Sequence, residues 1–360
     1  MLNQEQVSQH DPLMERMLQA TAGVFDVFAV YIGERLGLYR ALADAKSLTP
    51  GELATRTNTH VRYVREWLEQ QATAGVLEVE DASSGALDRR CHLPAGHAEV
   101  LVERESLNYL AQLAVGVTRP LGSLLDAYRG GGGVRLAEYA IDFVEGQAGT
   151  NHASFLYDLG TEWRPSIPDV HARLQAEPPA RIADIGCGVG WSRIGMAQAY
   201  PRAQVDGFAL DQPSIERARA NTGEAGLNGR VTLQVRDPGD PTLAGSYDLV
   251  LALESIHDMS DPVRVLQSMR RLVDGNGAVV VGDERVGETF SPTGNDMEWM
   301  MYGWSVLHYL PVGMADDPSA GTDAVMRAST LRGYALRAGL RDVRVLPTDN
   351  LFFRFHRLRT

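Results

Sequence analysis

The pattern of hydrophobic and polar positions changes period near residue 180. From there onward, short apolar runs with the character of buried strands alternate with segments whose apolar residues recur at helical spacing. Such alternation indicates a mostly parallel sheet with helices on both faces. The predicted strands are Arg181–Ile185, Gln204–Leu210, Val231–Val235, Tyr247–Leu253, Ala278–Gly282, Asp342–Leu346 and Leu351–His356.

Helices fit the intervals between most of these strands. The last two strands are joined only by residues 347–350, and so short a link predicts an antiparallel hairpin, because parallel strands need a longer crossover. We therefore expect five parallel strands that end in an antiparallel hairpin. The predicted helices are Trp191–Ala199, Pro213–Gly223, Asp261–Leu272 and Ser329–Ala338.

The first hundred residues have the pattern of a winged helix. A helix is expected from Thr21 to about Gly37, after a polar arm or dimer-contacting helix in residues 1–20. Thr49 and Glu52 have the spacing of a capping box for a second helix, and a third runs from Val61 to Gly75. Two short strands follow, near Val76–Glu80 and Cys91–Leu93.

The chain is therefore expected to divide into three parts. Residues 1–104 form a winged-helix and dimerisation domain, and residues 105–179 form a helical connector that covers the active site. Four glycines at 130–133 interrupt the connector but lack the Lys-Ser/Thr pair of a phosphate loop. Residues 180–360 form the sheet domain, with a lid insertion at 285–327.

Composition weakens the case for nucleic acid as a partner. The 360 residues carry a formal net charge of −12, and residues 1–100 hold 14 acidic and 9 basic residues. Phosphate backbones are bound mainly by Lys and Arg, so we expect no nucleic-acid partner. Two isolated cysteines form no disulfide framework or zinc cluster. The absence of a signal-peptide pattern or a long apolar window predicts a cytoplasmic protein without membrane contact.

The strongest motif directly follows the first predicted strand of the sheet. It reads Asp184-Ile185-Gly186-Cys187-Gly188-Val189-Gly190 and opens a helix at Trp191. Its glycines let the backbone approach a ligand closely at a helix N-terminus. The dinucleotide fingerprint would need its third glycine at position 191. The acid at 184 also suits a cationic amino-acid ligand better than a pyrophosphate.

On these residues the chain resembles class I methyltransferases that depend on S-adenosyl-L-methionine (SAM), whose first motif reads D/E-x-G-x-G-x-G. The resemblance implies an α/β fold, with a Rossmann-like seven-stranded methyltransferase sheet and an N-terminal α-helical winged-helix domain. It implies SAM as cofactor and S-adenosyl-L-homocysteine (SAH) as product. The implied cofactor-binding residues are Asp184, Gly186, Gly188, Gly190, Asp211 and Asp237.

The roles of Asp211 and Asp237 follow from a comparison of their positions with the family pattern. The family pattern G-x-D-x-S/D places the ribose-binding acid at the position of Ala209, so the resemblance assigns this role to Asp211, two residues later. Asp237 corresponds to the acid that contacts the adenine amino group. The missing acid at 209 leaves open a SAM-binding enzyme of the same fold that does not methylate.

The segment Glu254-Ser255-Ile256-His257-Asp258-Met259 resembles the H-D-W-x-D segment of small-molecule O-methyltransferases, with Met259 in place of Trp. The resemblance implies that His257 is the general base that deprotonates a hydroxyl, since imidazole accepts protons near neutral pH. It also implies that acids after the fifth strand orient this base, and Asp283 and Glu284 occupy that place. The alternative is that His257 only positions the substrate.

The insertion supplies candidate substrate contacts. It interrupts the sheet at the carboxyl end of the strands, where open α/β sheets bind ligands. Its apolar and aromatic residues are either core or pocket. We take Tyr302, Trp304 and His308 as substrate-binding candidates.

The whole-chain pattern is similar to a family of mostly uncharacterised actinobacterial methyltransferases. We therefore expect a homodimeric enzyme that methylates a small molecule of secondary metabolism, with O-methylation favoured and no metal. The alternatives are a non-methylating SAM enzyme and a DNA-binding regulator that responds to SAM.

Overall fold

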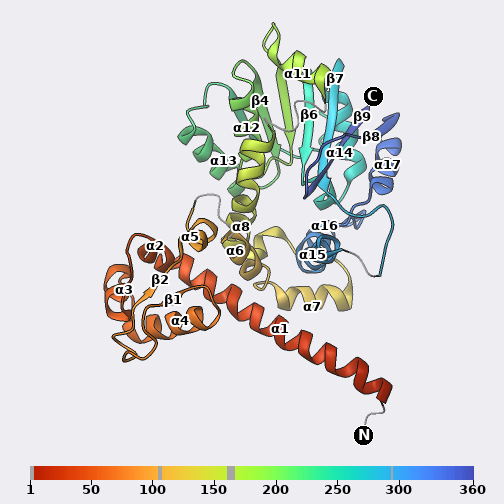
Figure 1. The fold of residues 1–360 in the computed structure, drawn as a ribbon. Helices are drawn as coiled ribbons and strands as arrows, with labels where there is room; N and C mark the ends of the chain where they lie inside the picture. The colour runs from red at the N-terminus through yellow and green to blue at the C-terminus, as the bar shows by residue number, and fades with distance from the viewer. Residues whose placement is uncertain (1–3, 104–107, 160–166, 293–294) are drawn as a thin grey trace. The chain divides into compact units, whose positions relative to one another are not determined.

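The computed structural model describes residues 4–103, 108–159, 167–292 and 295–360, which form two compact units (Figure 1). The first unit comprises Met1–Thr118 and Ile141–Thr150, and the second comprises Arg119–Ala140 and Asn151–Thr360. The predicted connector, residues 105–179, contributes to both units. Its expected boundary at residues 104–105 lies outside the described residues.

The second unit contains a seven-stranded sheet in the order β5-β4-β3-β6-β7-β9-β8. The first five strands in this order are parallel, and β9 is antiparallel to both β7 and β8, which confirms the predicted plan. The strands are β3 (Arg181–Ile185), β4 (Gln204–Ala209), β5 (Val231–Val235), β6 (Tyr247–Leu253), β7 (Val273–Glu284), β8 (Asp342–Val345) and β9 (Phe353–Arg359).

Two strands differ from the predicted bounds by more than one residue, and β4 and β8 each end one residue earlier than predicted. β7 begins five residues earlier than expected, because Val273 pairs with Tyr247 ahead of a register shift. β9 begins at Phe353 and not at Leu351, because the side chain of Asn350 accepts hydrogen bonds from the backbone of residues 352 and 353 and holds them in a turn.

Helices cover both faces of this sheet, as Figure 1 shows. On one face, α11 and α12 pack against strand residues such as Ile182 and Val280. On the other face, α14 and α17 pack against Ala183 and Val281. The helices are α11 (Pro168–Gln175), α12 (Trp191–Ala199), α13 (Gln212–Glu224), α14 (Pro262–Leu272) and α17 (Ala328–Arg337).

The first unit contains the expected winged helix. The capping box of α3 forms as predicted. Glu52 N donates a hydrogen bond to Thr49 Oγ1, and Thr49 N donates one to Glu52 Oε2. A compact core includes Leu53, Leu68 and Cys91. Its elements are α2 (Leu38–Ala43), α3 (Pro50–Thr57), α4 (Val61–Thr73), α5 (Ala95–Leu101) and the antiparallel pair β1 (Glu78–Val79) and β2 (Cys91–His92).

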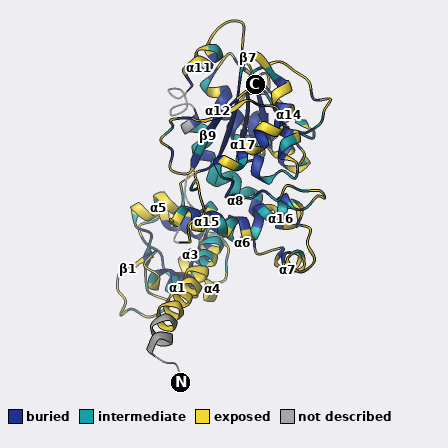
Figure 2. Cartoon of the chain, turned by 90° about the vertical axis from the view of Figure 1, so that its right-hand side faces the viewer, coloured by how far each residue is buried: buried dark blue, intermediate teal, exposed yellow. Residues whose placement is uncertain are grey.

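Helix α1 (Gln4–Arg35) extends well beyond the predicted start at Thr21. Its residues 10–25 are exposed, whereas the central strands β3 and β6 are mostly buried (Figure 2). Among the described residues, no helix has both the length and the apolar character needed to cross a membrane.

The connector and the insertion are helical, and each contains one π-helix. π-Helical turns occur frequently at functional sites. The connector elements are α6 (Tyr109–Gly116), α7 (Leu121–Gly130), η1 (Leu136–Tyr139), α8 (Ala140–Ala153) and the π-helix η2 (Ser154–Asp158). The insertion holds α15 (Asp296–Trp304), the π-helix η4 (Ser305–Tyr309) and α16 (Leu310–Gly313).

Candidate active site

The glycine motif forms a tight loop between β3 and α12. Gly186, Gly188 and Gly190 all have positive φ angles, of 73°, 45° and 99°. A Cβ on Gly186 would lie 2.4 Å from the Ser255 side chain, and one on Gly190 would lie 2.5 Å from the Arg193 guanidinium. A Cβ on Gly188 would meet nothing within 4 Å. Two of the glycines are therefore required for packing, and the third presents bare backbone to open space, as a ligand cradle requires.

Asp184 lies beneath this loop and not in front of it. Only 1% of the residue is exposed, and one carboxylate oxygen accepts a hydrogen bond from Ser192 Oγ at 2.6 Å. The same oxygen lies 4.0 Å from the guanidinium of the fully buried Arg193. Burial raises the pKa of Asp184, while Arg193 and Ser192 oppose this rise. Its charge is thus balanced inside the protein.

The end of β4 is apolar where the family pattern has an acid. Ala209 is buried in a small cluster with Cys187 and Ile215. Asp211 follows the strand and caps α13, since its Oδ2 accepts a hydrogen bond from Ser214 N at 2.8 Å.

Asp237 lies after β5 and is held on two sides. Its Oδ1 accepts a hydrogen bond from Gly239 N at 2.8 Å, and its Oδ2 lies 2.9 Å from Arg264 Nη1 on α14. An exposed arginine therefore already engages the predicted adenine contact.

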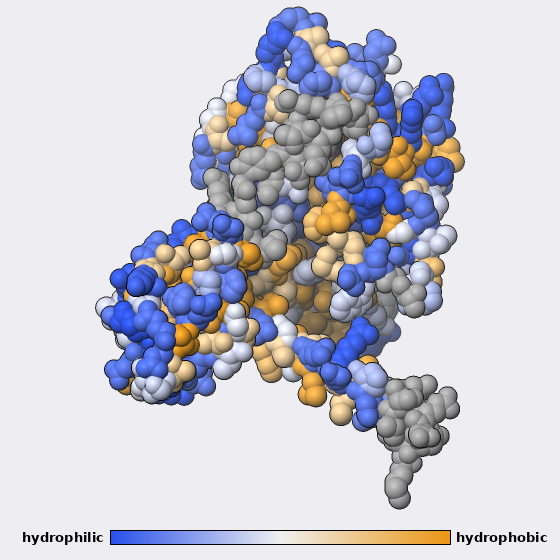
Figure 3. All heavy atoms as spheres, in the orientation of Figure 1, coloured by the Kyte–Doolittle hydropathy of each residue, from blue (hydrophilic) through white to orange (hydrophobic). Residues whose placement is uncertain are grey.

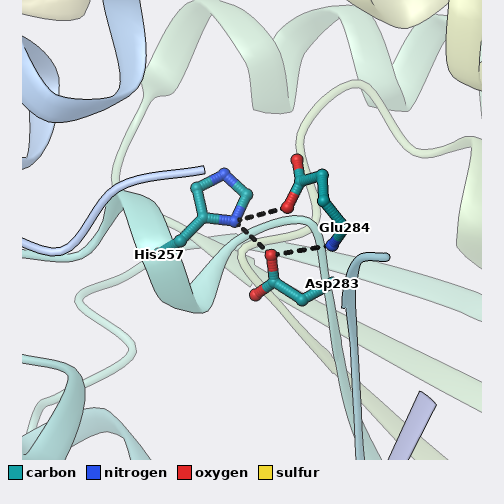
Figure 4. Close-up of side chains that lie close together, drawn as sticks. All are labelled: His257, Asp283 and Glu284. Carbon is teal, nitrogen blue, oxygen red and sulfur yellow. Dashed lines mark hydrogen bonds and ion pairs between the residues drawn. The ribbon is translucent and has the colours of Figure 1, made fainter. Parts of the chain in front are cut away.

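The most densely charged cluster surrounds His257, in the short helix η3 (Ile256–Asp258) that follows β6. Figure 4 shows the imidazole facing the last two residues of β7. His257 Nδ1 lies 2.6 Å from Asp283 Oδ1 and 3.2 Å from Glu284 Oε2. Asp283 is therefore the stronger orienting partner, and Glu284 supports it. All three residues are buried.

The protonation states in this cluster depend on one another. Burial alone would lower the pKa of His257, but the charges of Asp283, Glu284 and Asp258 raise it well above its ordinary value. Burial also raises the pKa of Glu284, whereas His257 and hydrogen bonds hold the pKa of Asp283 low. The opposite shifts of His257 and Asp283 mean that each stabilises the charged form of the other.

The same three groups have ligand atoms within 4.8 Å of one another, a spacing compatible with a metal ion. Two ligands about 2.1 Å from one ion in tetrahedral or octahedral geometry lie about 3.0–3.4 Å apart. The 2.6 Å between His257 Nδ1 and Asp283 Oδ1 is shorter and is typical of a charge-assisted hydrogen bond. The geometry favours an oriented base over a metal centre.

His257 Nε2 is the atom available for chemistry. It points away from Asp283 and Glu284 in Figure 4 and has no hydrogen-bond partner among the described residues. Asp258 Oδ1 lies 3.4 Å from it, beyond good hydrogen-bonding distance. A neutral His257 would accept a substrate proton at this nitrogen while Asp283 holds the ring in place.

The three candidates from the insertion occupy different surroundings. Tyr302 and Trp304 pack beside a small apolar cluster of Val286, Met301 and Val325. His308 lies in η4, next to Tyr309, and the Tyr309 ring contacts the His257 ring edge-on with centroids 4.7 Å apart. Burial, reinforced by the charge of His257, lowers the pKa of His308 to about 3. Of the three, His308 is the one that the structure brings near His257.

Glu254 lies near the His257 cluster, and sequence reasoning did not single it out. It directly follows β6, has a positive φ of 45° and accepts a hydrogen bond from Asn151 Nδ2. Burial raises its pKa to about 7, while the charge of His257 opposes this rise. Its position just after a strand adjacent to β3 was a usable signal. Asn151 gave no such signal, because it lies on a helix 103 residues away.

Two sequence families match separate parts of the chain. Residues 177–312 match the family described as "Methyltransferase domain", and residues 26–103 match the "Rv2258c-like winged HTH domain". The first range covers the glycine loop and the His257 cluster, and the second covers the winged helix.

Characterised relatives match only in part. The chain is 35% identical over 104 residues to 27-O-demethylrifamycin SV methyltransferase of Amycolatopsis mediterranei (strain S699). This match covers 29% of the chain and 38% of that protein, so it spans well under two thirds of the relative's length.

Solved structures match over nearly the whole length. The structure of the mitomycin 7-O-methyltransferase MmcR has a TM-score of 0.74 at 19% identity, covering 98% of this chain and 99% of that one. Human N-acetylserotonin methyltransferase in complex with SAM has a TM-score of 0.69 at 16% identity, with coverages of 98% and 99%. At these identities the likeness establishes the shared fold.

Proposed function

We propose that this chain, in which a methyltransferase domain follows an Rv2258c-like winged helix-turn-helix domain, methylates a small molecule with SAM as methyl donor. O-methylation is favoured. The observation that supports this most directly is a single edge of the sheet that carries both an open glycine loop and an oriented histidine. SAM supplies an electrophilic methyl group on its sulfonium.

The residues at the glycine loop fit this cofactor. Gly188 offers backbone to open space at the start of α12, and Asp211 and Asp237 stand at the ends of the next two strands. Since β3, β4 and β5 are adjacent and parallel, these residues lie along one edge of the sheet. We assign the methionine end of SAM to the loop, its ribose to Asp211 and its adenine to Asp237.

His257 acts as the base in this proposal. Its Nε2 accepts the proton of a substrate hydroxyl, Asp283 fixes the ring through Nδ1, and Glu284 lies beside the same nitrogen. His308, Tyr302 and Trp304 contribute to the acceptor site from the insertion. The acceptor is an aromatic or polyketide-like molecule of secondary metabolism, a class supported by the relative that acts on demethylrifamycin.

The test is calorimetric titration of the purified protein with SAM and SAH. Micromolar binding that is lost in Gly188→Trp supports the cofactor site, because an indole there would fill the open cradle. Methyl transfer is then assayed with a panel of phenols and hydroxylated polyketides. SAM binding without methyl transfer to any acceptor would favour the non-methylating alternative, and no binding of SAM or SAH would contradict the proposal.

The regulatory alternative is disfavoured by the charges on α4. Arg62 pairs with Glu66, and Arg65 and Arg89 lie near Glu69, so acidic neighbours offset the basic charge on this helix. A helix that binds the major groove needs net positive charge. We expect no gel shift with duplex DNA at physiological salt, with or without SAM.

A further inference from the structure

Glu254 stands next to the glycine loop. β3 and β6 are adjacent parallel strands, so their carboxyl ends emerge side by side. The link continues beyond the strands, since Ser255 Oγ donates a hydrogen bond to Ile185 O at 3.0 Å, and the Ser255 side chain packs against Gly186. Glu254 lies directly between Ser255 and the last residue of β6.

The C-terminal end of α8 connects the same two features. Asn151 Nδ2 donates a hydrogen bond to the Glu254 carboxylate. His152, the next residue, contacts the ring of Trp191, the first residue of α12, with centroids 4.2 Å apart. Two consecutive residues thus reach the glycine loop on one side and Glu254 on the other, which places the Glu254 carboxylate beside the loop.

The backbone of Glu254 is held in an unfavourable conformation. A φ of 45° is uncommon for a residue other than glycine, and only one further non-glycine residue among the described positions, Asn58 at a helix C-cap, has a positive φ. Strained conformations of this kind concentrate at functional sites, where surrounding contacts enforce them. Here the contacts are Asn151 and a hydrogen bond from Glu254 N to Gly282 O at 2.9 Å.

Asp184 is unsuited to the role that its motif suggests. It is fully buried, and Ser192 and Arg193 already compensate its charge. Glu254 is more exposed, and the side chain that donates a hydrogen bond to it, that of Asn151, is a neutral amide. A cationic ligand group at the loop would therefore meet Glu254 first.

We propose that Glu254 is the carboxylate that binds the ammonium group of the cofactor's methionine moiety, with Asn151 as its positioning residue, and that Asp184 has a structural role. This inference rests on the proposed function. Among the described residues, the acidic groups of Glu254, Asp258 and Asp283 all act on the charge of His257. An added ammonium group balances that excess of acid.

The experiment compares two ligands by calorimetry at pH 8. SAH carries the ammonium group, whereas 5′-methylthioadenosine shares its nucleoside and sulfur but lacks the amino-acid part. Glu254→Gln keeps the size of the side chain and removes its charge. We expect this variant to weaken SAH by about 10- to 100-fold, the effect of one charged hydrogen bond, and to leave 5′-methylthioadenosine within about threefold.

Three further variants make the test specific. Glu284→Gln replaces a neighbouring carboxyl group with an amide, and it should leave the ratio of the SAH affinity to the 5′-methylthioadenosine affinity unaltered. Asp184→Asn should lower thermal stability, because it leaves Arg193 buried without a counter-charge, but should not alter the ratio. Asn151→Ala should lower the SAH affinity severalfold relative to the 5′-methylthioadenosine affinity. This variant serves as the second test if Glu254→Gln does not fold.

The outcomes separate the two proposals. If the wild-type protein binds neither ligand, the proposed function fails and this inference fails with it. If it binds both and the ratio is unaltered in Glu254→Gln, or falls as far in Asp184→Asn, the assignment to Glu254 is overturned while the cofactor site stands.

Discussion

At the scale of single residues, the site combines a strong base with a high resting charge. The carboxylates around His257 raise its pKa well above the ordinary value, so the imidazole is protonated at neutral pH. A protonated imidazole cannot accept a proton from a hydroxyl. The base becomes active only when the pH approaches its raised pKa, or when a bound acceptor displaces the proton.

The rate of methyl transfer to a hydroxyl acceptor should therefore increase with pH above neutrality. In Asp283→Asn the pKa of His257 falls, so the rising limb should move to lower pH, with a lower plateau because the ring is less well oriented. His257→Gln should lower kcat by about 10²- to 10⁴-fold and retain SAH binding. A pH–rate profile of each protein measures both effects, and identical profiles for wild type and Asp283→Asn would contradict them.

Glu254 predicts a stability that depends on pH. Its pKa in the folded protein is about 7, against an ordinary value of 4.5. Between these values the folded protein holds a proton that the unfolded chain has released, so stability falls as pH rises through this window. Glu254→Gln has no such titrating group, so its stability does not fall in this window. The difference in Tm between Glu254→Gln and the wild type should therefore increase in favour of the variant by about 2–4 °C between pH 5 and pH 8. A difference that is constant with pH would contradict the raised pKa.

Sequence reasoning found His257 and its acids because their motif resembles known ones, and the structure brings His257, Asp283 and Glu284 together. It took Glu284 as the weaker candidate of the two acids, but it could not predict that both reach one imidazole, since adjacent strand residues normally point to opposite faces. It also could not find that Asp184 faces inward, because this depends on Arg193 folding back beneath the loop.

At the scale of elements, the carboxyl ends of the strands determine where chemistry is possible. The period of the apolar residues predicted β3, β5, β6 and α12 to the residue. Exposed segments were less predictable. α1 extends through a polar stretch that the sequence left open as arm or helix, because helix formation there has no buried face to reveal it.

Asp211 caps helix α13 and is also the residue to which we assign ribose binding. Its Oδ2 caps α13, and an amide oxygen can do the same. Asp211→Asn should therefore keep Tm within about 1 °C and weaken SAH, because the charge that would bind the ribose is lost. Asp211→Ala should also lose the cap, at about 1 kcal/mol. Thermal melts and calorimetry separate these effects, and unaltered SAH affinity in Asp211→Asn would remove the ribose role.

At the scale of the whole molecule, α1 points to self-association. The helix has 32 residues and is about 48 Å long. Apolar side chains at helical spacing are exposed along it, and Figure 3 shows them as orange and tan spheres among hydrophilic ones. Large exposed apolar patches mark interaction surfaces. The exposed residues are Leu13, Met14, Met17, Leu18, Val24, Phe25, Phe28 and Ile32.

We propose a homodimer in which α1 of each copy covers this surface. Leu18→Glu combined with Phe25→Glu should convert the dimer to a monomer without unfolding it, since both side chains are more than 60% exposed. Gln19→Glu combined with Gly23→Glu adds the same charges on the opposite side of the helix and should leave the dimer intact. Analytical ultracentrifugation measures the masses, and a monomeric wild-type protein would contradict the proposal.

The pairing of β7 with β9 has a consequence for the order in which the site is built. Asp283 and Glu284 are paired directly with Arg354 and Phe353, about 70 positions later in the chain. A ribosome synthesises these partners only after the histidine, both acids and the whole insertion have emerged. The acids therefore gain their final support late, and nascent chains that lack β9 carry the histidine and both acids without the strand that supports them.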